Sequence, residues 1–314
     1  MPITLVTGGA GFIGSNLVEA LVARGHEVRV LDDLSSGYRK NIEPFVASGR
    51  ARFTEGDLRD SRLVASLVDG CDYVIHQAAI PSVVKSVEDP VLTHDVNVNG
   101  TFGLFEAARK AGVKRVVFAG SSAVYGNSEV LPKVESMAPA PLSPYALHKS
   151  AGEAYGKIYT ELYGLEVVTL RYFNVFGPRQ DPKSDYAAVI PKFITRMLSG
   201  RPVTIFGDGS QTRDFCHIDN VVEANLLACT TAGVAGMSFN IACGERISLV
   251  QLVQRLNQVL GTDLAPEFAP PRAGDIAHSV ADISLARSAL RYTAPVDLTL
   301  GLERTIAWYR AQGA

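Results

Sequence analysis

The first half of the chain alternates short apolar runs with longer segments in which apolar residues recur at helical spacing. Amphipathic segments predict helices that include residues 13–24, 98–111 and 144–162. The apolar runs predict buried strands at Ile3–Thr7, Val28–Asp32, Ala51–Glu55, Tyr73–His76, Arg115–Ala119 and Glu166–Leu170. Because apolar strands that alternate with helices form parallel sheets covered on both faces, we expect an α/β fold with a doubly wound, Rossmann-type parallel sheet.

The pattern becomes irregular after residue 174, where the loops contain more proline and glycine. Helices are still expected near residues 189–198, 221–229, 249–260 and 298–311. We therefore expect a second, smaller, mixed α/β domain. The predicted division is 1–174 for the sheet domain and 175–314 for the smaller one, with an interlaced boundary.

Composition and charge narrow the classes of protein that fit. The chain has 314 residues, of which 47% are hydrophobic and 20% charged, so disorder is not expected. The formal net charge of −2 leaves no basic excess for nucleic acid. No apolar stretch approaches the ~20 residues needed to span a bilayer, so we expect no membrane association. The four cysteines are far apart, which predicts no disulfide framework and no metal site and favours the cytoplasm.

A glycine-rich segment, Thr7-Gly8-Gly9-Ala10-Gly11-Phe12-Ile13-Gly14, lies between the first strand and the first helix. In this context Gly8 permits a tight turn, Gly11 lets a pyrophosphate approach, and Gly14 allows close packing of helix and strand. Asp32 ends the second strand, where its carboxylate can accept hydrogen bonds from the adenosine ribose and would repel a 2′-phosphate. The segment predicts NAD binding, and the alternative is a purely structural turn.

Further candidates follow the third and fourth strands. Asp57-Leu58 lies at the edge where adenine is expected, although Asp57 would serve equally well as a cap of the next helix. Gln77-Ala78-Ala79 brings small residues to the expected path of the cofactor, and simple packing is the alternative.

Tyr145 and Lys149 place a phenol and an ammonium four residues apart, on one face of a helix. A free Tyr has a pKa near ~10, so it needs neighbouring positive charge to act as a base. Ser121, directly after the fifth strand, can share the reacting hydroxyl with Tyr145. The alternatives are a solvated helix face and a serine that bonds within a turn. His148 is assigned no chemistry.

Four motifs occur in order: Thr7-Gly8-x-x-Gly11-x-x-Gly14, Ser121 four residues before Tyr125, Tyr145-x-x-x-Lys149, and Arg171-Tyr172-Phe173-Asn174. Together they resemble the extended short-chain dehydrogenase/reductase family, in its nucleotide-sugar epimerase and dehydratase branch. The resemblance covers essentially the whole chain. It implies NAD as the cofactor and a UDP-sugar as the substrate.

The resemblance also implies site residues. The predicted cofactor contacts are Gly8, Gly11, Phe12, Ile13, Gly14, Asp32, Asp33, Ser36, Gly37, Asp57, Leu58, Gln77, Ala78, Ala79, Asn97, Tyr145, Lys149 and Phe173. The predicted nucleotide contacts are Asn174 at the diphosphate, Ala188, Val189, Ile205 and Phe206 at uracil, Arg213 and Arg272 at phosphate, and Asp275 at the ribose. The predicted sugar contacts are Ser82, Ser121, Ser122, Tyr145, Gln180 and Ser279.

The same resemblance favours one reaction. Dehydratases of this branch have an Asp-Glu pair after the catalytic hydroxyl, and many decarboxylases have a carboxylate there, whereas this chain has Ser122-Ala123. This leaves 4-epimerisation of a UDP-hexose through a 4-keto intermediate, with Ser121, Tyr145 and Lys149 as catalytic residues. Ser279 matches a position where a small residue leaves room for a 2-acetamido group, so we expect UDP-GlcNAc/UDP-GalNAc and also UDP-Glc/UDP-Gal as substrates.

Two alternatives remain from the sequence. One is another NAD-dependent nucleotide-sugar enzyme, such as a UDP-glucuronate 4-epimerase or decarboxylase, a 4,6-dehydratase or a 4-reductase. The other is a non-catalytic NAD-sensing regulator. By resemblance we also expect a homodimer formed through the helices near residues 98–111 and 144–162.

Overall fold

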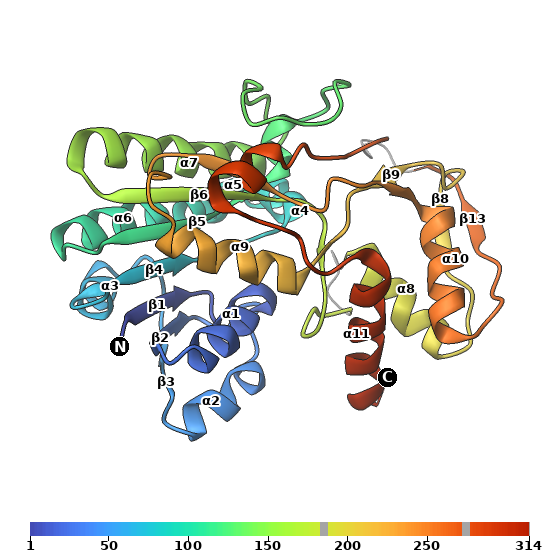
Figure 1. Ribbon diagram of the computed structural model, residues 1–314, viewed down its shortest axis with the longest axis horizontal. Coiled ribbons are helices and arrows are strands. Elements are labelled where there is room, and N and C mark those ends of the chain that lie inside the picture. The colour runs from blue at the N-terminus through green and yellow to red at the C-terminus, as the bar shows by residue number, and fades with distance from the viewer. Residues whose placement is uncertain (183–187, 272–276, 314) are drawn as a thin grey trace.

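The computed structural model describes residues 1–182, 188–271 and 277–313, and a seven-stranded sheet forms its centre (Figure 1). The strands lie in the order β11-β6-β5-β4-β1-β2-β3, and every neighbouring pair is parallel. Their bounds are β1 (Ile3–Thr7), β2 (Glu27–Asp32), β3 (Ala51–Glu55), β4 (Tyr73–His76), β5 (Arg115–Ser121), β6 (Glu166–Tyr172) and β11 (Ser238–Ile241). The strands expected from the sequence are confirmed, and the winding reverses between β1 and β4.

Helices cover both faces of this sheet, as the apolar strands require. On one face α6 packs on α3 and α7, and α7 lies along β5 and β6; on the other, α1 and α9 pack together. The bounds are α1 (Phe12–Ala23), α2 (Glu43–Ala47), α3 (Ser61–Val68), α4 (Val83–Glu88), α5 (Pro90–His94), α6 (Thr101–Lys110), α7 (Pro144–Tyr163) and α9 (Ile218–Thr230). The helix expected over 98–111 begins as a π-helical segment, residues 95–100, that leads into α6.

A smaller lobe lies beside the sheet and has its own apolar core, which includes Ile190, Phe193 and Leu252. It contains α8 (Val189–Leu198), α10 (Leu249–Leu260) and α11 (Leu298–Ala311), as the sequence predicts. Three short strand pairs complete it: β8 (Thr204–Phe206) with β13 (Glu267–Ala269), β9 (Thr212–Arg213) with β12 (Ile247–Ser248), and β7 (Val175–Phe176) with β10 (Cys216–His217).

The chain after residue 174 serves both parts of the molecule. The helix expected near 221–229 is α9, which packs on β5 and β6 of the large sheet, and β11 extends that sheet beside β6. The division into 1–174 and 175–314 therefore stays a prediction.

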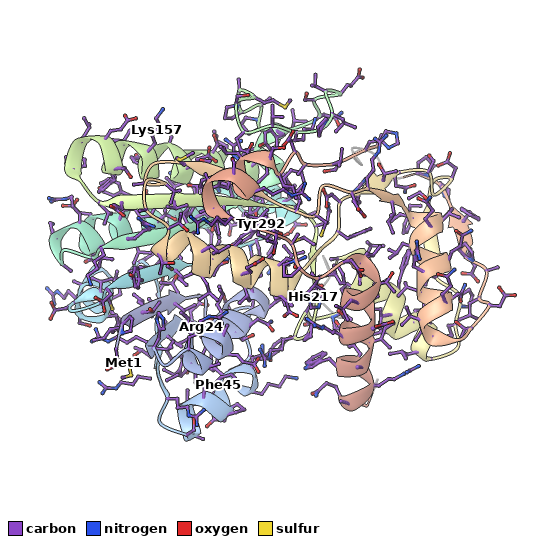
Figure 2. All side chains as sticks on the ribbon, in the orientation of Figure 1. Met1, Arg24, Phe45, Lys157, His217 and Tyr292 are labelled. Atoms are coloured by element: carbon purple, nitrogen blue, oxygen red, sulfur yellow. The ribbon has the colours of Figure 1, made fainter. Side chains whose placement is uncertain are left out.

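His217 lies where the two parts meet, at the start of α9 and close to α11 (Figure 2). Its ring packs edge-on against Phe176, with ring centres 5.4 Å apart. A Cβ atom on Gly301 of α11 would lie 3.1 Å from His217, so a small residue is needed there. This tight packing fixes the smaller lobe against the sheet.

Within the described ranges, no helix has both the length and the apolarity to cross a membrane. Cys71, Cys216, Cys229 and Cys243 are free cysteines. The cytoplasmic location stays a prediction.

Candidate functional site

The turn between β1 and α1 has no room for side chains at its glycines. Gly8 has a φ of +66°, and a Cβ atom there would lie 2.7 Å from the backbone nitrogen of Ala78. A Cβ atom on Gly14 would lie 2.1 Å from the carbonyl oxygen of Gly8. α1 begins after Gly11 without a side-chain cap, so its first-turn N–H groups remain available to an anion. The turn fits a dinucleotide pyrophosphate.

Asp32 ends β2 beside this turn and is buried. Its Oδ2 accepts a hydrogen bond from the Ala10 N–H, and its Oδ1 accepts one from the Leu34 N–H, both at 2.9 Å. Gly37 packs so closely that a Cβ atom there would lie 3.0 Å from Oδ1. Burial raises the pKa of Asp32, while these N–H donors act in the opposite direction. The carboxylate is held rigidly where a ribose is predicted, whereas Asp33 and Ser36 are exposed.

Asp57 at the end of β3 forms an ion pair with Arg59, with a shortest N–O distance of 2.6 Å. This pair lowers the pKa of Asp57. The alternative that Asp57 caps the next helix is wrong, because Asp60 is the N-cap of α3. Leu58 is buried beneath the π-helical segment, against Gly100. A role of Asp57 and Leu58 at adenine stays a prediction.

The segment after β4 is held from two sides. The side chain of Asn97 accepts a hydrogen bond from the Ile80 N–H at 2.8 Å and donates to the Ile80 carbonyl at 3.1 Å. Gln77 donates from Nε2 to the hydroxyl of Tyr172 at 2.9 Å. The predicted residues Gln77, Ala78 and Ala79 therefore follow a fixed path past Gly8.

Sequence reasoning missed His76, which connects the glycine-rich turn to this segment. Thr101 donates to the Asn97 carbonyl and so accepts from Nε2 of His76 at 3.0 Å. Nδ1 of His76 then accepts from the Thr7 hydroxyl at 2.7 Å. Burial lowers the pKa of His76 to about 3, so the ring is neutral. Its place at the last residue of an apolar strand is the signal that could have identified it.

The predicted catalytic residues meet at the carboxyl end of β5. Ser143 caps α7 by accepting from the Ala146 N–H at 3.2 Å, as expected. Lys149 is buried and donates from Nζ to the Ala119 carbonyl at 2.8 Å, with Nζ 5.9 Å from the centre of the Tyr145 ring. Ser121 lies near the Tyr145 hydroxyl and, against the larger effect of burial, lowers the pKa of that phenol. One face of α7 thus presents a phenol and an ammonium to a serine.

Burial shapes the charges of this cluster. It raises the pKa of Tyr145, and Ser121 offsets part of that effect. It lowers the pKa of Lys149 to about 8. Ionisation of Tyr145 therefore needs positive charge beyond that of Lys149, which an oxidised nicotinamide ring carries.

A hollow of about 370 Å³ in the smaller lobe brings predicted nucleotide contacts together. Its walls include Asn174, Ala188, Val189, Phe206 and Arg213. Sequence reasoning missed other lining residues, among them Lys192, Phe193, Thr204, Gln211, Phe215 and Leu249. Helical and strand periodicity are the signals for three of them, since Lys192 and Phe193 follow Val189 by one turn and Thr204 alternates with Phe206.

Ile205 requires a correction. It has no exposed surface and lies in the core of the smaller lobe, because the residue between Thr204 and Phe206 faces the opposite side of the strand. Its side chain is therefore not a uracil contact. The predicted contacts Arg272 and Asp275 lie outside the described residues.

The predicted sugar contacts have diverse surroundings. Ser82 caps α4 by accepting from the Lys85 N–H at 3.0 Å, and Ser122 follows Ser121 directly. Gln180 donates from Nε2 to the Val175 carbonyl at 3.2 Å, while its Oε1 is buried without a partner. The Ser279 N–H donates to the Thr212 carbonyl at 3.1 Å, next to Arg213. Their contacts with a sugar stay predictions.

Phe173, a predicted cofactor contact, is buried with its ring centre 6.3 Å from that of Tyr125. Its role at the cofactor also stays a prediction.

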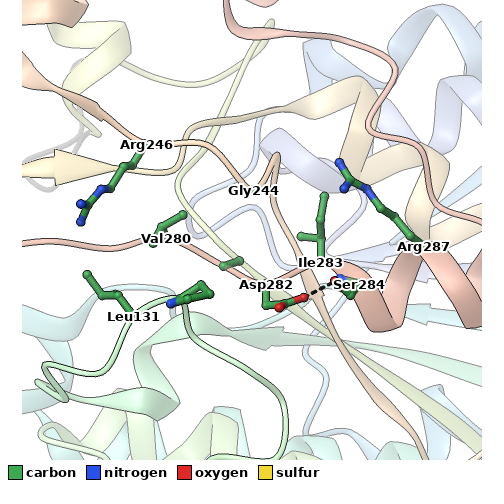
Figure 3. A pocket seen from close by; sticks show the side chains of 10 residues that line it. Leu131, Gly244, Arg246, Val280, Asp282, Ile283, Ser284 and Arg287 are labelled. Atoms are coloured by element: carbon green, nitrogen blue, oxygen red, sulfur yellow. Dashed lines mark hydrogen bonds between the residues drawn. The ribbon is translucent and has the colours of Figure 1, made fainter.

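A second hollow, of about 450 Å³, is lined by other residues (Figure 3). Leu131 lies on one side of it, Arg246 and Arg287 at its ends, and Asp282 accepts a hydrogen bond from Ser284 on its floor. None of the predicted site residues lines it among the described residues.

Comparison with known proteins places this geometry in a family. The model of the NAD dependent epimerase/dehydratase family matches residues 4–242. The chain is 43% identical to a UDP-glucose 4-epimerase of Mycolicibacterium smegmatis, over 98% of each chain.

Two solved structures are similar over almost their whole length. One is a UDP-N-acetylglucosamine 4-epimerase from Methanobrevibacter ruminantium in complex with UDP-N-acetylmuramic acid, with 39% identity, a TM-score of 0.94 and coverage of 99% of both chains. The other is a Thermus thermophilus UDP-glucose 4-epimerase in complex with NAD, with 40% identity, a TM-score of 0.86 and coverage of 98% of this chain and 99% of that one. The chain therefore belongs to the NAD-dependent epimerase/dehydratase family, as an enzyme of the epimerase type whose cofactor is NAD.

Proposed function

We propose that the enzyme interconverts UDP-hexoses that differ in configuration at C4, through a 4-keto intermediate. The observation that carries this proposal is the cluster of Tyr145, Lys149 and Ser121 at the carboxyl end of β5. NAD, when bound, supplies a reversible hydride acceptor.

The residues of the cluster divide the proton chemistry. Tyr145, as phenolate, takes the proton of the sugar 4-hydroxyl. It returns the proton after the 4-keto sugar has rotated to present its opposite face. Ser121 holds the oxygen on which charge develops. Lys149 contributes the positive charge that favours the phenolate. No acid or base side chain at Ser122-Ala123 is present to expel water from the ring.

The hollow in the smaller lobe anchors the nucleotide in this proposal. Its apolar walls suit a flat uracil, and Arg213 suits a diphosphate because guanidinium groups bind phosphate oxygens bidentately. We propose both UDP-GlcNAc/UDP-GalNAc and UDP-Glc/UDP-Gal as substrates. The small Ser279 supports the acetamido sugars, and the curated and solved relatives carry names of both kinds.

The direct test incubates the purified holoenzyme separately with UDP-GlcNAc and UDP-Glc, without added reductant, and follows the sugar by proton NMR. Signals of the C4 epimer at constant total sugar support the proposal. A 4-keto-6-deoxy sugar would instead favour a dehydratase. No conversion of either substrate would favour an enzyme that acts on a UDP-glucuronate, such as a decarboxylase, or a non-catalytic NAD-binding protein.

We also infer a homodimer formed through α6 and α7. The outer face of α7 exposes Leu147, Ile158 and Leu162. Ile158 lies about three turns and Leu162 about four turns after Leu147, so all three are on one side of the helix. Phe102 of α6 extends this apolar face, and 44% of its surface is exposed. A contiguous apolar helix face suits burial against a second copy of the same helices.

A further inference from the structure

The catalytic face of α7 continues beyond the two residues that the reaction uses. Tyr145, Lys149 and Glu153 follow one another at intervals of four, so they lie in one row along the helix. Glu153 takes no part in the chemistry described above. Its side chain instead binds Arg171, which contacts the turn that follows Ser121.

Glu153 forms a bidentate ion pair with Arg171 of β6. Nε of Arg171 donates to Oε2 of Glu153 at 2.9 Å, and Nη2 donates to Oε1. Arg171 is 3% exposed, so the pair lies in the interior. Truncating one member of such a pair leaves the other buried and uncompensated, which makes the geometry of the pair hard to change.

Arg171 also reaches the turn that carries Ser121. Its Nη1 donates to the hydroxyl of Tyr125 at 2.7 Å, and its guanidinium carbon lies 4.9 Å from the centre of the Tyr125 ring. Tyr125 ends the short 3₁₀ helix, Ser122–Tyr125, that Ser121 caps. Its hydroxyl donates in turn to Oδ1 of Asn240 on β11 at 2.6 Å.

These contacts connect the two sides of the catalytic centre through a buried chain: α7, Glu153, Arg171, Tyr125 and the Ser121 turn. We propose that Glu153, Arg171 and Tyr125 are positioning residues. They fix the position of α7 relative to the Ser121 turn, and so the distance between the Tyr145 hydroxyl and Ser121. The proposal rests on the 4-epimerase reaction proposed above.

A second Arg–Glu pair, between β5 and β6, provides a matched control. Arg115 and Glu166 pair at the opposite end of the β5–β6 ladder, with Nε and Oε2 2.8 Å apart. Arg115 is also buried, and its Nη1 donates to the carbonyls of Ala228 and Thr231. This pair has similar chemistry but no contact with the catalytic turn, so it separates a positioning role from a stabilising one.

The experiment compares E153Q and Y125F, which keep side-chain size, with E166Q, using the holoenzyme and the UDP-sugar that it converts. Small misplacements of reacting groups are costly, so we expect kcat to fall about 10- to 100-fold in E153Q and Y125F while KM stays within about threefold. The acid limb of the kcat–pH profile should also move to higher pH, because Tyr145 loses its place relative to Lys149 and Ser121. E166Q should lower the melting temperature without changing kcat.

Near wild-type kcat and an unmoved pH profile in both E153Q and Y125F would overturn the proposal, as would an equal loss of kcat in E166Q. Absence of epimerisation by the wild-type enzyme would refute the proposed function itself, which distinguishes the two failures.

Discussion

The proposed catalytic cluster and the proposed nucleotide pocket differ in how far their charged side chains are buried. At the carboxyl end of the large sheet, Lys149 and His76 are buried, and burial lowers their pKa values to about 8 and about 3. In the smaller lobe, Arg213 and Lys192 line an open hollow among apolar side chains; Arg213 is half-buried and Lys192 is exposed. Burial shifts the pKa values of the groups that transfer protons, whereas cationic side chains at an open pocket can bind a charged ligand directly. Changes in the first region should therefore act on kcat, and changes in the second on KM.

The largest effect is expected from Tyr145→Phe. Removing the phenolic oxygen removes the base, and kcat should fall by about 10³-fold while the affinity for UDP-sugar stays close to normal. Calorimetric titration with UDP and steady-state rates measure the two quantities. Tyr155→Phe, on the same helix but away from Ser121, is the matched control and should keep its activity; a Tyr145→Phe enzyme with normal turnover would reject Tyr145 as the base.

Lys149 should set the alkaline limit of activity. Burial lowers the pKa of Lys149 to about 8, so above that pH the residue loses the positive charge that favours the Tyr145 phenolate. We expect kcat/KM to decline above pH 8. Lys149→Arg stays charged and should lose this decline, although its rate will be lower. An unchanged alkaline limb in that variant would show that another group titrates there.

The same burial has a consequence for stability. The unfolded chain retains the Lys149 proton up to a pKa near ~10.4, whereas the folded protein releases it near 8. The charged ammonium therefore destabilises the fold below pH 8, and this cost fades as the pH rises toward 10. Lys149→Met should keep or raise the melting temperature at pH 7 despite its loss of activity. A clear drop at pH 7, measured by calorimetry, would contradict this sign.

Arg213→Met should change KM rather than kcat, in contrast to Tyr145→Phe. Loss of a charge-assisted contact to phosphate is expected to raise KM for UDP-sugar about 10- to 100-fold, with kcat within about threefold. Arg255→Met, an exposed change on α10, serves as the control for surface charge in this lobe. Unchanged KM in the Arg213 variant would remove this residue from the nucleotide site.

The smallest effect on activity is expected at the proposed dimer face. Leu147→Lys with Leu162→Lys places two charges on the exposed side of α7 and should yield monomers in analytical ultracentrifugation. Activity per chain should change by less than about threefold, because the catalytic face of α7 is the opposite one. Val130→Lys, at another exposed apolar residue, should leave the mass unchanged. A wild-type enzyme that sediments as a monomer would end the dimer proposal.

The sequence predicts the sheet and the catalytic row well because both depend on local periodicity. Apolar runs define β1 to β6, and a spacing of four places Tyr145 and Lys149 on one face. β11 was missed because Ser238–Ile241 is short and follows irregular chain, and only pairing with β6 makes it a strand. Ile205 was misassigned because the family resemblance indicated only that the segment Ile205-Phe206 lies at uracil. The alternation of side chains along a strand decides which of the two residues faces the pocket.

Long-range contacts account for the rest of what the sequence does not show. The partners that the side chains of Asn97, His76 and Arg171 bind in these contacts lie between 17 and 69 residues away along the chain. No local pattern records such pairings, and only the folded chain brings them together.

The most direct test of the central claim follows the hydrogen at C4 of the sugar. The holoenzyme is incubated with UDP-glucose and, separately, UDP-GlcNAc in D₂O, and the epimeric product is examined by NMR and mass spectrometry. If the hydrogen leaves C4 as hydride and returns to the same carbon, the product will contain no deuterium at C4. Solvent deuterium at C4 would show that a proton is removed from carbon instead, and would contradict the proposed chemistry.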